Sequence, residues 1–408
     1  MPTVSIVLPT YNRANLLAEA ITSALQQTWD KLEVLVVDDG STDHTVDVVR
    51  DLARRDERVH YFYQENAGVS EARNRALNMM SGQLVAFLDS DDVWLPWKLE
   101  AQVALLTARP EIGMCWTNMD AITPTGELKE KNFLRHMYGA YQWFEGQEIF
   151  AEKRSLGDCC TGSLAPELQQ IEVQSGSIYR QMFYGNLVHT PTVVLRREWA
   201  QQVGSFDRSM RRGGEDFKYH LATCRLGEVA YLDAASILYR VGNEDQLTKR
   251  ENNLEFARSY IRTIQEELRY HSEKSGLSDN DIANIRWQAH DWLASEYLIH
   301  HYRARSFYHC LKALQHKRNA PGTWRTILKS VLPTAAVRAG KRLLRKDPDA
   351  RNRVHPIQVD ALVVDEENTL NELNSAAGQQ NSTAGTPPLV EVPNSVDMVL
   401  NSSSMARV

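Results

Sequence analysis

One pattern constrains the fold of this chain more than any other: an apolar run that stops abruptly at polar side chains. It occurs three times in the N-terminal quarter, in runs that begin at Val4, Leu32 and Leu84. The segments between the runs carry apolar residues at helical spacing, and His60–Tyr63 adds a further short strand. Apolar runs that alternate with helices predict an open, largely parallel sheet with helices on both faces.

The polar residues that follow the three runs should lie close together in space. They are Thr10–Arg13, Asp38–Asp43 and Asp89–Asp92. Ligands of such sheets bind outside the carboxyl ends of the strands. The sequence therefore predicts a binding site at that edge of the sheet.

The third polar cluster is the most acidic. In the segment LVAFLDSDDVW, Leu84 to Trp94, an expected buried strand is followed by Asp89, Asp91 and Asp92. Like charges at this spacing repel, and burying an unpaired carboxylate is costly. A divalent cation bound by oxygen ligands would relieve both costs. The alternative is a solvated first turn of a helix, where Asp is also favoured.

The other residues at this edge suit a nucleoside diphosphate. Tyr11 offers a flat ring, Asp39 a fixed acceptor and Arg73 a guanidinium, while Asp89 and Asp91 offer oxygens to a metal. Each also has a plainer interpretation: the ring could pack at a strand end, Asp39 could shape a turn and Arg73 could solvate a helix. The convergence of all five favours the ligand site.

Four motifs in this order resemble the family 2 glycosyltransferases: VSIVLPTYNRANLL, VVDDGSTD, NAGVSEARNRAL and FLDSDDVW. The resemblance covers Pro2 to about Thr248. It implies a GT-A (Rossmann-like) fold, in which a mixed, mostly parallel sheet is flanked by helices. It also implies a nucleotide-diphosphate sugar as donor, Mn²⁺ or Mg²⁺ as cofactor, and inversion at the anomeric carbon.

The resemblance extends to individual residues. It implies that Tyr11 stacks on the base, Asp39 reads the edge of the base, and Arg73 lies in the helix beside the nucleotide. Asp89 and Asp91 match the ends of the DxD motif, the first for the ribose and the second for the metal. The expected donor-binding set is Pro9, Tyr11, Asp39, Asn66, Arg73 and Asp89. Asp92 has two possible roles: it either contacts the sugar or caps the next helix.

The catalytic base is expected in the second half of the chain. GGEDF, Gly213 to Phe217, opens an apparent helix. A carboxylate at a helix start is by itself an ordinary cap. An inverting transfer, however, needs one base to take the proton of the acceptor hydroxyl. The resemblance places that base in this ED pair, so Asp216 is expected to be the base and Glu215 its neighbour, with the reverse assignment as the alternative.

One departure from the family concerns YRxH, which reads YRVG here. Tyr239 and Arg240 are present, but Gly242 stands where the family has His. Arg240 could partly substitute in binding the diphosphate, or the loop could simply close over the donor. His189, in LVHTPT, is expected to be an acceptor-side or structural residue rather than a metal ligand.

Composition sets limits on location and partners. The net charge of −6 argues against a general nucleic-acid binder. Five cysteines without a CxxC pair, and no signal peptide, favour a reducing cytoplasm. No apolar stretch is long enough to span a bilayer, and the QxxRW signature of processive synthases is missing. Transfer of a single sugar, most simply from a UDP-sugar, to a glycan or lipid-linked saccharide is expected.

The expected organisation has four parts: a nucleotide-sugar-binding half (1–110), an acceptor-binding half (111–250), a helical extension (251–346) and a disordered tail (347–408). Phe133–Met182 is aromatic and irregular, and it either shapes the acceptor pocket or packs as a small subcore. The extension could form a homo-oligomer surface. Within it, Thr323–Lys346 is basic and amphipathic, which favours contact with an anionic membrane at the inner face of the plasma membrane; a solvated basic helix is the alternative.

Two other classes of protein stay open. A sugar nucleotidyltransferase could use a similar sheet, but its glycine-rich loop should follow the first strand, and PTYNRAN contains no glycine. A catalytically inactive nucleotide-sugar-binding protein would keep the donor residues without a working base.

Overall fold

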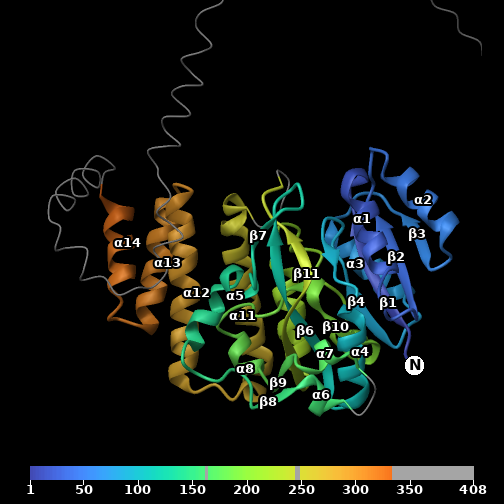
Figure 1. Ribbon diagram of the computed structural model, residues 1–408. Helices are drawn as coiled ribbons and strands as arrows, with labels where there is room; N and C mark the ends of the chain where they lie inside the picture. The colour runs from blue at the N-terminus through green and yellow to red at the C-terminus, as the bar shows by residue number, and fades with distance from the viewer. Residues whose placement is uncertain (161–163, 244–248, 333–408) are drawn as a thin grey trace, which may run out of the picture. The chain divides into compact units, whose positions relative to one another are not determined.

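The computed structural model describes residues 1–160, 164–243 and 249–332, all within one compact unit (Figure 1). Its N-terminal part has the predicted alternation of strands and helices. The elements are β1 (Val4–Thr10), α1 (Ala14–Leu25), β2 (Leu32–Asp38), α2 (Thr45–Arg55), β3 (Val59–Tyr63), α3 (Val69–Met79) and β4 (Leu84–Phe87). β1 and β4 are buried along their whole length, as the apolar runs predicted.

The strands form one mixed sheet in the order β3-β2-β1-β4-β10-β6-β11-β9-β8. The remaining strands are β5 (Val93–Trp94), β6 (Ile112–Ile122), β7 (Leu128–Glu130), β8 (Glu152–Ser155), β9 (Glu172–Gly176), β10 (Val194–Arg196) and β11 (Glu228–Arg240). The pairs among β3, β2, β1 and β4 are parallel, and so is the long β6–β11 pair. The short β10 is antiparallel to both β4 and β6, between which it lies. The predicted fold class, a mixed and mostly parallel sheet flanked by helices, is confirmed.

Shorter helices connect the strands of the second half. They are α4 (Lys98–Ala108), α5 (Leu134–Met137), α6 (Leu156–Cys159), α7 (Pro166–Gln169), α8 (Tyr179–Met182), α9 (Arg197–Val203) and α10 (Glu215–Cys224), with the 3₁₀ helices η1 (Gly139–Phe144), η2 (Thr190–Thr192) and η3 (Arg250–Asn252). Within Phe133–Met182, Tyr141 is buried, whereas Trp143 and Phe144 pack on Tyr184. Much of this segment is therefore a packed subcore.

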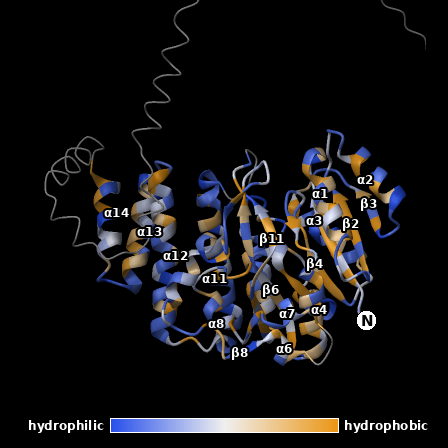
Figure 2. Ribbon diagram, in the orientation of Figure 1, coloured by the Kyte–Doolittle hydropathy of each residue, from blue (hydrophilic) through white to orange (hydrophobic). Residues whose placement is uncertain are grey.

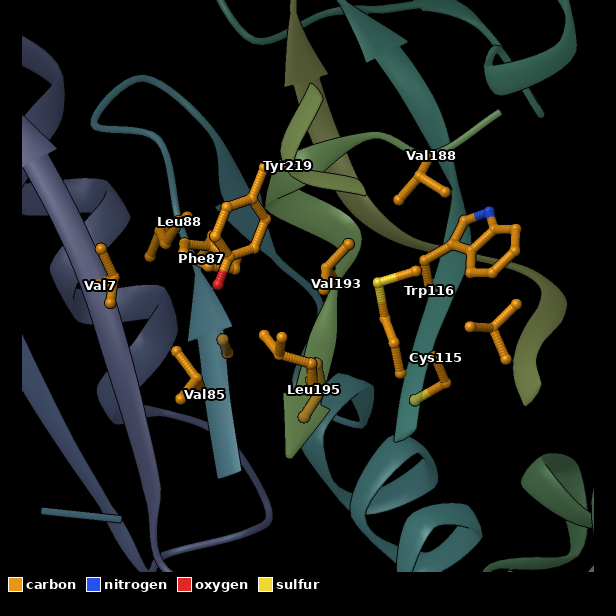
Figure 3. Packing of buried hydrophobic residues seen from close by; sticks show 14 of the residues in the cluster. Val7, Val85, Phe87, Leu88, Cys115, Trp116, Val188, Val193, Leu195 and Tyr219 are labelled. Carbon is orange, nitrogen blue, oxygen red and sulfur yellow. The ribbon is translucent and has the colours of Figure 1, made fainter. Parts of the chain in front are cut away.

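The core runs through the middle of the sheet (Figure 3). Side chains of β4, β10 and β6 interdigitate there, and the strands are predominantly apolar in Figure 2. The rings of Phe206 and Tyr219 stack with their centroids 4.0 Å apart, and Phe87 meets Phe206 edge-on. This aromatic packing fixes α10 beside the carboxyl end of β4.

Four helices follow the sheet: α11 (Asn253–Ser275), α12 (Asp279–Ile299), α13 (Arg303–His316) and α14 (Pro321–Val331). They confirm the helical pattern predicted for Glu251–His316. α11 buries Leu254, Tyr260 and Ile264 in the core, and the Tyr260 hydroxyl donates to the carbonyl of Phe183 at 2.8 Å. The boundaries of the four predicted parts stay predictions, and residues 333–346 and the tail at 347–408 lie outside the described residues. No helix in the described part of the chain is long and apolar enough to cross a membrane.

Candidate active site

The donor-binding residues predicted from the first two motifs lie where β1 and β2 end. Pro9 is buried within β1, and Tyr11 directly follows the strand with 46% of its surface exposed. The amide N–H of Asp39 donates to the Thr10 carbonyl at 2.8 Å, which joins the two strand ends. The ring of Tyr11 is therefore accessible to a ligand beside Asp39.

Asp39 has a structural role that the sequence did not reveal. Its Oδ1 accepts from the Gln64 side chain at 2.7 Å and from the Ala67 amide at 2.8 Å, and its Oδ2 accepts from the Gly68 amide at 2.8 Å. An ionised carboxylate offers about four acceptor positions. Three are used to fix the loop that opens α3, so one position remains for a ligand donor such as a base N–H.

Gly40 and Asn66 show why this loop needs a glycine. Gly40 has φ +85°, and a Cβ there would lie 2.8 Å from the amide nitrogen of Asn66. Any other residue would push the Asn66 loop away from β2. Asn66 itself is exposed at this edge, which agrees with its predicted place among the donor-binding residues without testing it.

The three carboxylates after β4 have different environments. Asp91 keeps 19% of its side chain exposed and accepts from Asn243 Nδ2 at 3.1 Å, with Arg13 at 4.0 Å. Burial, and then the charge of Asp89, raises the pKa of Asp91. Asp92 is fully buried, and one of its oxygens accepts from the Arg240 amide at 3.0 Å. Asp92 is therefore a structural anchor for β11.

Arg73 connects the predicted donor side of the site to the ED pair. Its guanidinium is buried and donates from Nη2 to Asp89 at 3.0 Å and from Nη1 to Glu215 at 3.1 Å. It also lies over the ring of Phe206, 5.4 Å from the centroid. Because α3 starts at the loop held by Asp39, one helix links Asp39 to this ion-pair cluster.

All three nitrogens of the Arg240 guanidinium donate hydrogen bonds to other groups of the protein. Its Nε donates to the carbonyl of Asp91 at 3.0 Å, Nη1 to the carbonyl of Pro124 at 2.9 Å, and Nη2 to Glu19 at 2.8 Å. The side chain is also buried. Arg240 therefore positions the Asp91 loop, and it is not placed to substitute for a phosphate-binding histidine.

The ED pair stands at the start of α10. Glu215 is buried, and desolvation together with the charge of Asp216 raises its pKa to about 7, although Arg73 opposes the shift. Burial raises the pKa of Asp216 as well. Asp216 Oδ2 accepts from Asn186 Nδ2 at 3.3 Å, and Oδ1 accepts from the Phe217 amide at 2.7 Å. Glu215 is thus bonded to Arg73, while Asp216 is bonded to Asn186 and to the amide of Phe217.

Glycines at positions 213 and 214 allow α11 to pack against this helix start. Both have positive φ, +128° and +92°. A Cβ on Gly213 would lie 2.3 Å from a ring carbon of Phe256, and one on Gly214 would lie 2.5 Å from Ser259 Cβ. The helical extension therefore packs directly against the segment that carries the ED pair.

Tyr138 and His189 form a polar pair close to these carboxylates. The Tyr138 hydroxyl and His189 Nδ1 are 3.0 Å apart, and the His189 ring meets Tyr239 edge-on at 4.8 Å. Burial lowers the pKa of His189 to about 4, so the ring is neutral. Sequence reasoning singled out His189 and placed Tyr138 in an aromatic segment that could shape the acceptor pocket. It gave no role to Asn186, since a GN pair is a weak signal.

The residues present fit a divalent cation that is shared with a substrate. No group of three or more His, Cys, Asp or Glu within the described ranges could hold a metal by itself. Mg²⁺ and similar ions are, however, commonly bound by one or two carboxylates together with substrate phosphates. Asp91, partly exposed and with a raised pKa, would gain from a cation. Asp91 and the neighbouring Asp89 are therefore suitable protein ligands for a cation that also binds substrate phosphates.

Known proteins with similar sequences support the resemblance of the N-terminal part to glycosyltransferases. Residues 5–163 match the family model described as Glycosyl transferase family 2. A Bacillus subtilis glycosyltransferase named for teichuronic acid biosynthesis, TuaG, is 42% identical over 109 residues, 26% of this chain and 43% of that protein. Glycosyltransferase GlyA of Streptococcus pneumoniae is 44% identical over 92 residues, 22% of this chain and 13% of that protein.

These similarities identify the N-terminal part of the chain as a glycosyltransferase domain. Residues 5–163 belong to family 2 of these enzymes, as the four motifs predicted. The chain spans less than half the length of these two curated relatives. Among solved structures, the mannosyltransferase PcManGT of Pyrobaculum calidifontis, in complex with GDP-Man and Mn²⁺, has a TM-score of 0.49 at 18% identity, covering 86% of this chain and 82% of that one.

Proposed function

We propose that this protein transfers a single sugar, with inversion, from a nucleotide-diphosphate sugar to a hydroxyl of an acceptor. The observation that carries the proposal is the buried Arg73, which binds Asp89 on the donor side and Glu215 in the ED pair. Donor and base residues are thereby held in one cluster, as a one-step displacement requires.

The donor would bind along the carboxyl ends of β1, β2 and β4. The exposed Tyr11 ring would stack on the base, the remaining acceptor position of Asp39 would receive a base N–H, and Asp89 would contact the ribose. A uracil base, with one N–H between two carbonyls, suits a single carboxylate acceptor. A UDP-sugar is therefore the proposed donor.

Asp91, with Asp89 beside it, would hold Mn²⁺ or Mg²⁺ against the diphosphate. Such an ion would neutralise charge that develops on the leaving group. Arg13, 4.0 Å from Asp91, adds positive charge beside the same site. The Asp91 loop is held in place by Arg240 and Asn243, so its geometry does not depend on the ligand.

Asp216 would act as the base. It would take the proton of the acceptor hydroxyl while that oxygen forms its bond to the anomeric carbon. The bond from this carbon to the diphosphate breaks, and the nucleoside diphosphate leaves with the electron pair. One base is enough because no covalent intermediate forms. Glu215 is tied to Arg73 and would orient Asp216 and the acceptor, while Tyr138 and Asn186 would line the acceptor side.

The acceptor is proposed to be a glycan or a lipid-linked saccharide of the cell surface. The similarity to a relative named for teichuronic acid biosynthesis supports this class of acceptor. We place the reaction in the cytoplasm, at the inner face of the plasma membrane, where lipid-linked saccharides would be accessible.

Asp216→Asn tests the assignment of the base. The variant should lose transfer by about a hundredfold or more, the usual effect of removing a general base, yet retain Mn²⁺-dependent nucleotide binding. Transfer is measured as release of nucleoside diphosphate from UDP-, GDP- and dTDP-sugars, and binding by calorimetry. Glu215→Gln is the matched control, expected to weaken transfer less.

Two results would change the proposal. Unchanged transfer by Asp216→Asn would remove Asp216 as the base, and a larger loss in Glu215→Gln would give that role to Glu215. If the native chain binds nucleotide and metal but releases no product from any donor across a range of glycan acceptors, it is a nucleotide-sugar-binding protein.

A further inference from the structure

The last described helix, α14, packs with its polar side inward. Its buried residues are Thr323, Thr326 and Ser330, whereas Trp324, Leu328 and Val331 are 51%, 58% and 63% exposed. Both kinds of residue are visible on α14 in Figure 2. A helix that only covers the protein body would bury its apolar stripe.

Hydrogen bonds explain the inward direction of the hydroxyl groups. The Thr323 hydroxyl donates to Asp291 of α12 at 2.5 Å and accepts from Trp287 Nε1 at 3.1 Å. Arg303 of α13 donates to the carbonyl of Ser330 at 2.9 Å. These contacts fix the rotation of α14, so its apolar stripe is held outward by the fold.

The neighbouring helix α13 also leaves large apolar side chains exposed. It buries Ser306, Cys310, Ala313 and Leu314, whereas Phe307, Tyr308 and Leu311 are exposed. We name these three residues, together with Trp324, Leu328 and Val331 of α14, the α13–α14 surface. Two packed helices that together expose six large apolar side chains normally have a partner.

The charge around this surface indicates what the partner is. From residue 297 to 346 the sequence contains 12 Lys and Arg residues and no Asp or Glu, although the whole chain carries a net charge of −6. Arg305, Lys312, Arg325 and Lys329 lie on α13 and α14 themselves, and Lys312 lies over the ring of Tyr308 at 5.7 Å. Apolar side chains next to basic ones are typical of helices that lie in the interface of an anionic bilayer.

We propose that the α13–α14 surface docks the protein on an anionic lipid bilayer. A second copy of the chain is a poorer partner, because a symmetric contact would bring the same positive charges face to face. The proposal enlarges the predicted basic segment, Thr323–Lys346, to include α13, and of that segment residues 333–346 lie outside the described part. It shares with the proposed function only the lipid-linked acceptor, and a binding assay without sugars separates the two.

Flotation of the full chain with vesicles of phosphatidylcholine, with and without phosphatidylglycerol, tests the proposal. The native chain should float with the anionic vesicles at physiological salt and stay behind with the neutral ones. Each basic residue near such a surface contributes about 1 kcal/mol, so Arg305→Gln with Arg325→Gln should weaken binding by roughly thirtyfold. Trp324→Ala with Leu328→Ala should weaken it similarly by removing the apolar contact.

Matched controls keep the test specific. Tyr270→Ala and Leu128→Ala remove exposed apolar side chains of α11 and β7, and they should leave flotation unchanged. A further full-length variant changes the five basic residues at 338, 341, 342, 345 and 346 to Gln. Soluble transfer to a short acceptor should be retained by all variants, which shows that they fold.

Several results would overturn the proposal. Equal recovery with neutral and anionic vesicles would show that anionic lipid is not required for binding. Native-like flotation of both α13–α14 variants would show that this surface does not bind the bilayer. If the change at residues 338–346 alone abolishes flotation, the later segment is the anchor. If the α14 variant instead dissociates a dimer in size-exclusion chromatography, or loses binding to an oligonucleotide, without any effect on flotation, the surface serves that other partner.

Discussion

The guanidinium of Arg73 donates hydrogen bonds to two carboxylates that are far apart in the sequence. Asp89 follows β4, and Glu215 begins α10. The charge of Arg73 lowers the pKa of Glu215, against the larger effect of burial and that of Asp216. The protonation state of the ED pair therefore depends on a residue of the donor-side helix.

This coupling predicts a pH effect. A carboxylate base works in its ionised form, so activity should fall as the pH drops through the pKa of Asp216, which burial raises above its usual range. Arg73→Gln removes a cation that favours the ionised form, so the acidic limb of kcat/KM should move to higher pH by about one to two units. Arg75→Gln is the control, because this half-buried arginine of the same helix donates to the Tyr63 carbonyl rather than to a carboxylate of the site. An acidic limb at the same pH in Arg73→Gln would show that the pair is not coupled in this way.

At the scale of elements, the site depends on how closely α10 and α11 approach. Gly213 and Gly214 leave space for Phe256 and Ser259, and side chains at these positions would collide with α11. Sequence reasoning treated the ED pair as a helix start and α11 as a separate appendage. The distances join the two into one structural unit.

Gly214→Ala should therefore destabilise the protein by more than its positive φ alone explains. Gly204 is a fitting control, because it has φ +85° and nothing within 4 Å of its added Cβ. The alanine at 214 should cost about 1 to 3 kcal/mol more than the alanine at 204, measured by denaturant unfolding. Combining Gly214→Ala with Ser259→Gly should recover part of that loss. Equal costs at 204 and 214 would mean that α11 shifts freely.

The N-terminal elements could be predicted from sequence because each depends on local signals. Apolar runs defined β1, β2 and β4, and the strand-end polar residues gave Tyr11, Asp39 and Asp91. The contacts of Arg73 and Asp39 could not be predicted, since they depend on tertiary packing between distant segments. For α14 the amphipathic pattern was visible in the sequence, but the hydrogen bonds of Thr323 to α12 decide which side faces outward.

For the whole molecule, α11 is part of the core. Tyr260 donates to the Phe183 carbonyl and packs on Phe217 with ring centroids 5.4 Å apart. Arg180 and Tyr184 both donate to Asp281 of α12, at 2.8 and 2.9 Å. The sheet and the first two helices of the extension therefore share apolar and polar contacts.

A chain that ends at residue 250 should consequently fail to fold stably. It would expose the apolar surface that Leu254, Tyr260 and Ile264 cover, and removing several such side chains from a core costs more than most domains can lose. Expression followed by size-exclusion chromatography and thermal unfolding would show aggregation or a lost transition. A chain that ends at Leu332 is the control and should unfold cooperatively. A soluble, cooperatively unfolding 1–250 fragment would contradict the shared core.

The two adjacent glycines before Glu215 also bear on how this protein can be re-engineered. Many enzymes tolerate exchange of an appended helical segment because the junction is a flexible linker. Here the junction includes the contact of Gly213 and Gly214, which have no side chains, with α11. Replacing α11 with the helix of another protein would move the carboxylates of the ED pair unless the new helix presented the same profile to Gly213 and Gly214. The ED pair and the helices α11 and α12 should therefore be kept together, and chimaeras should be cut after α12 rather than before α11.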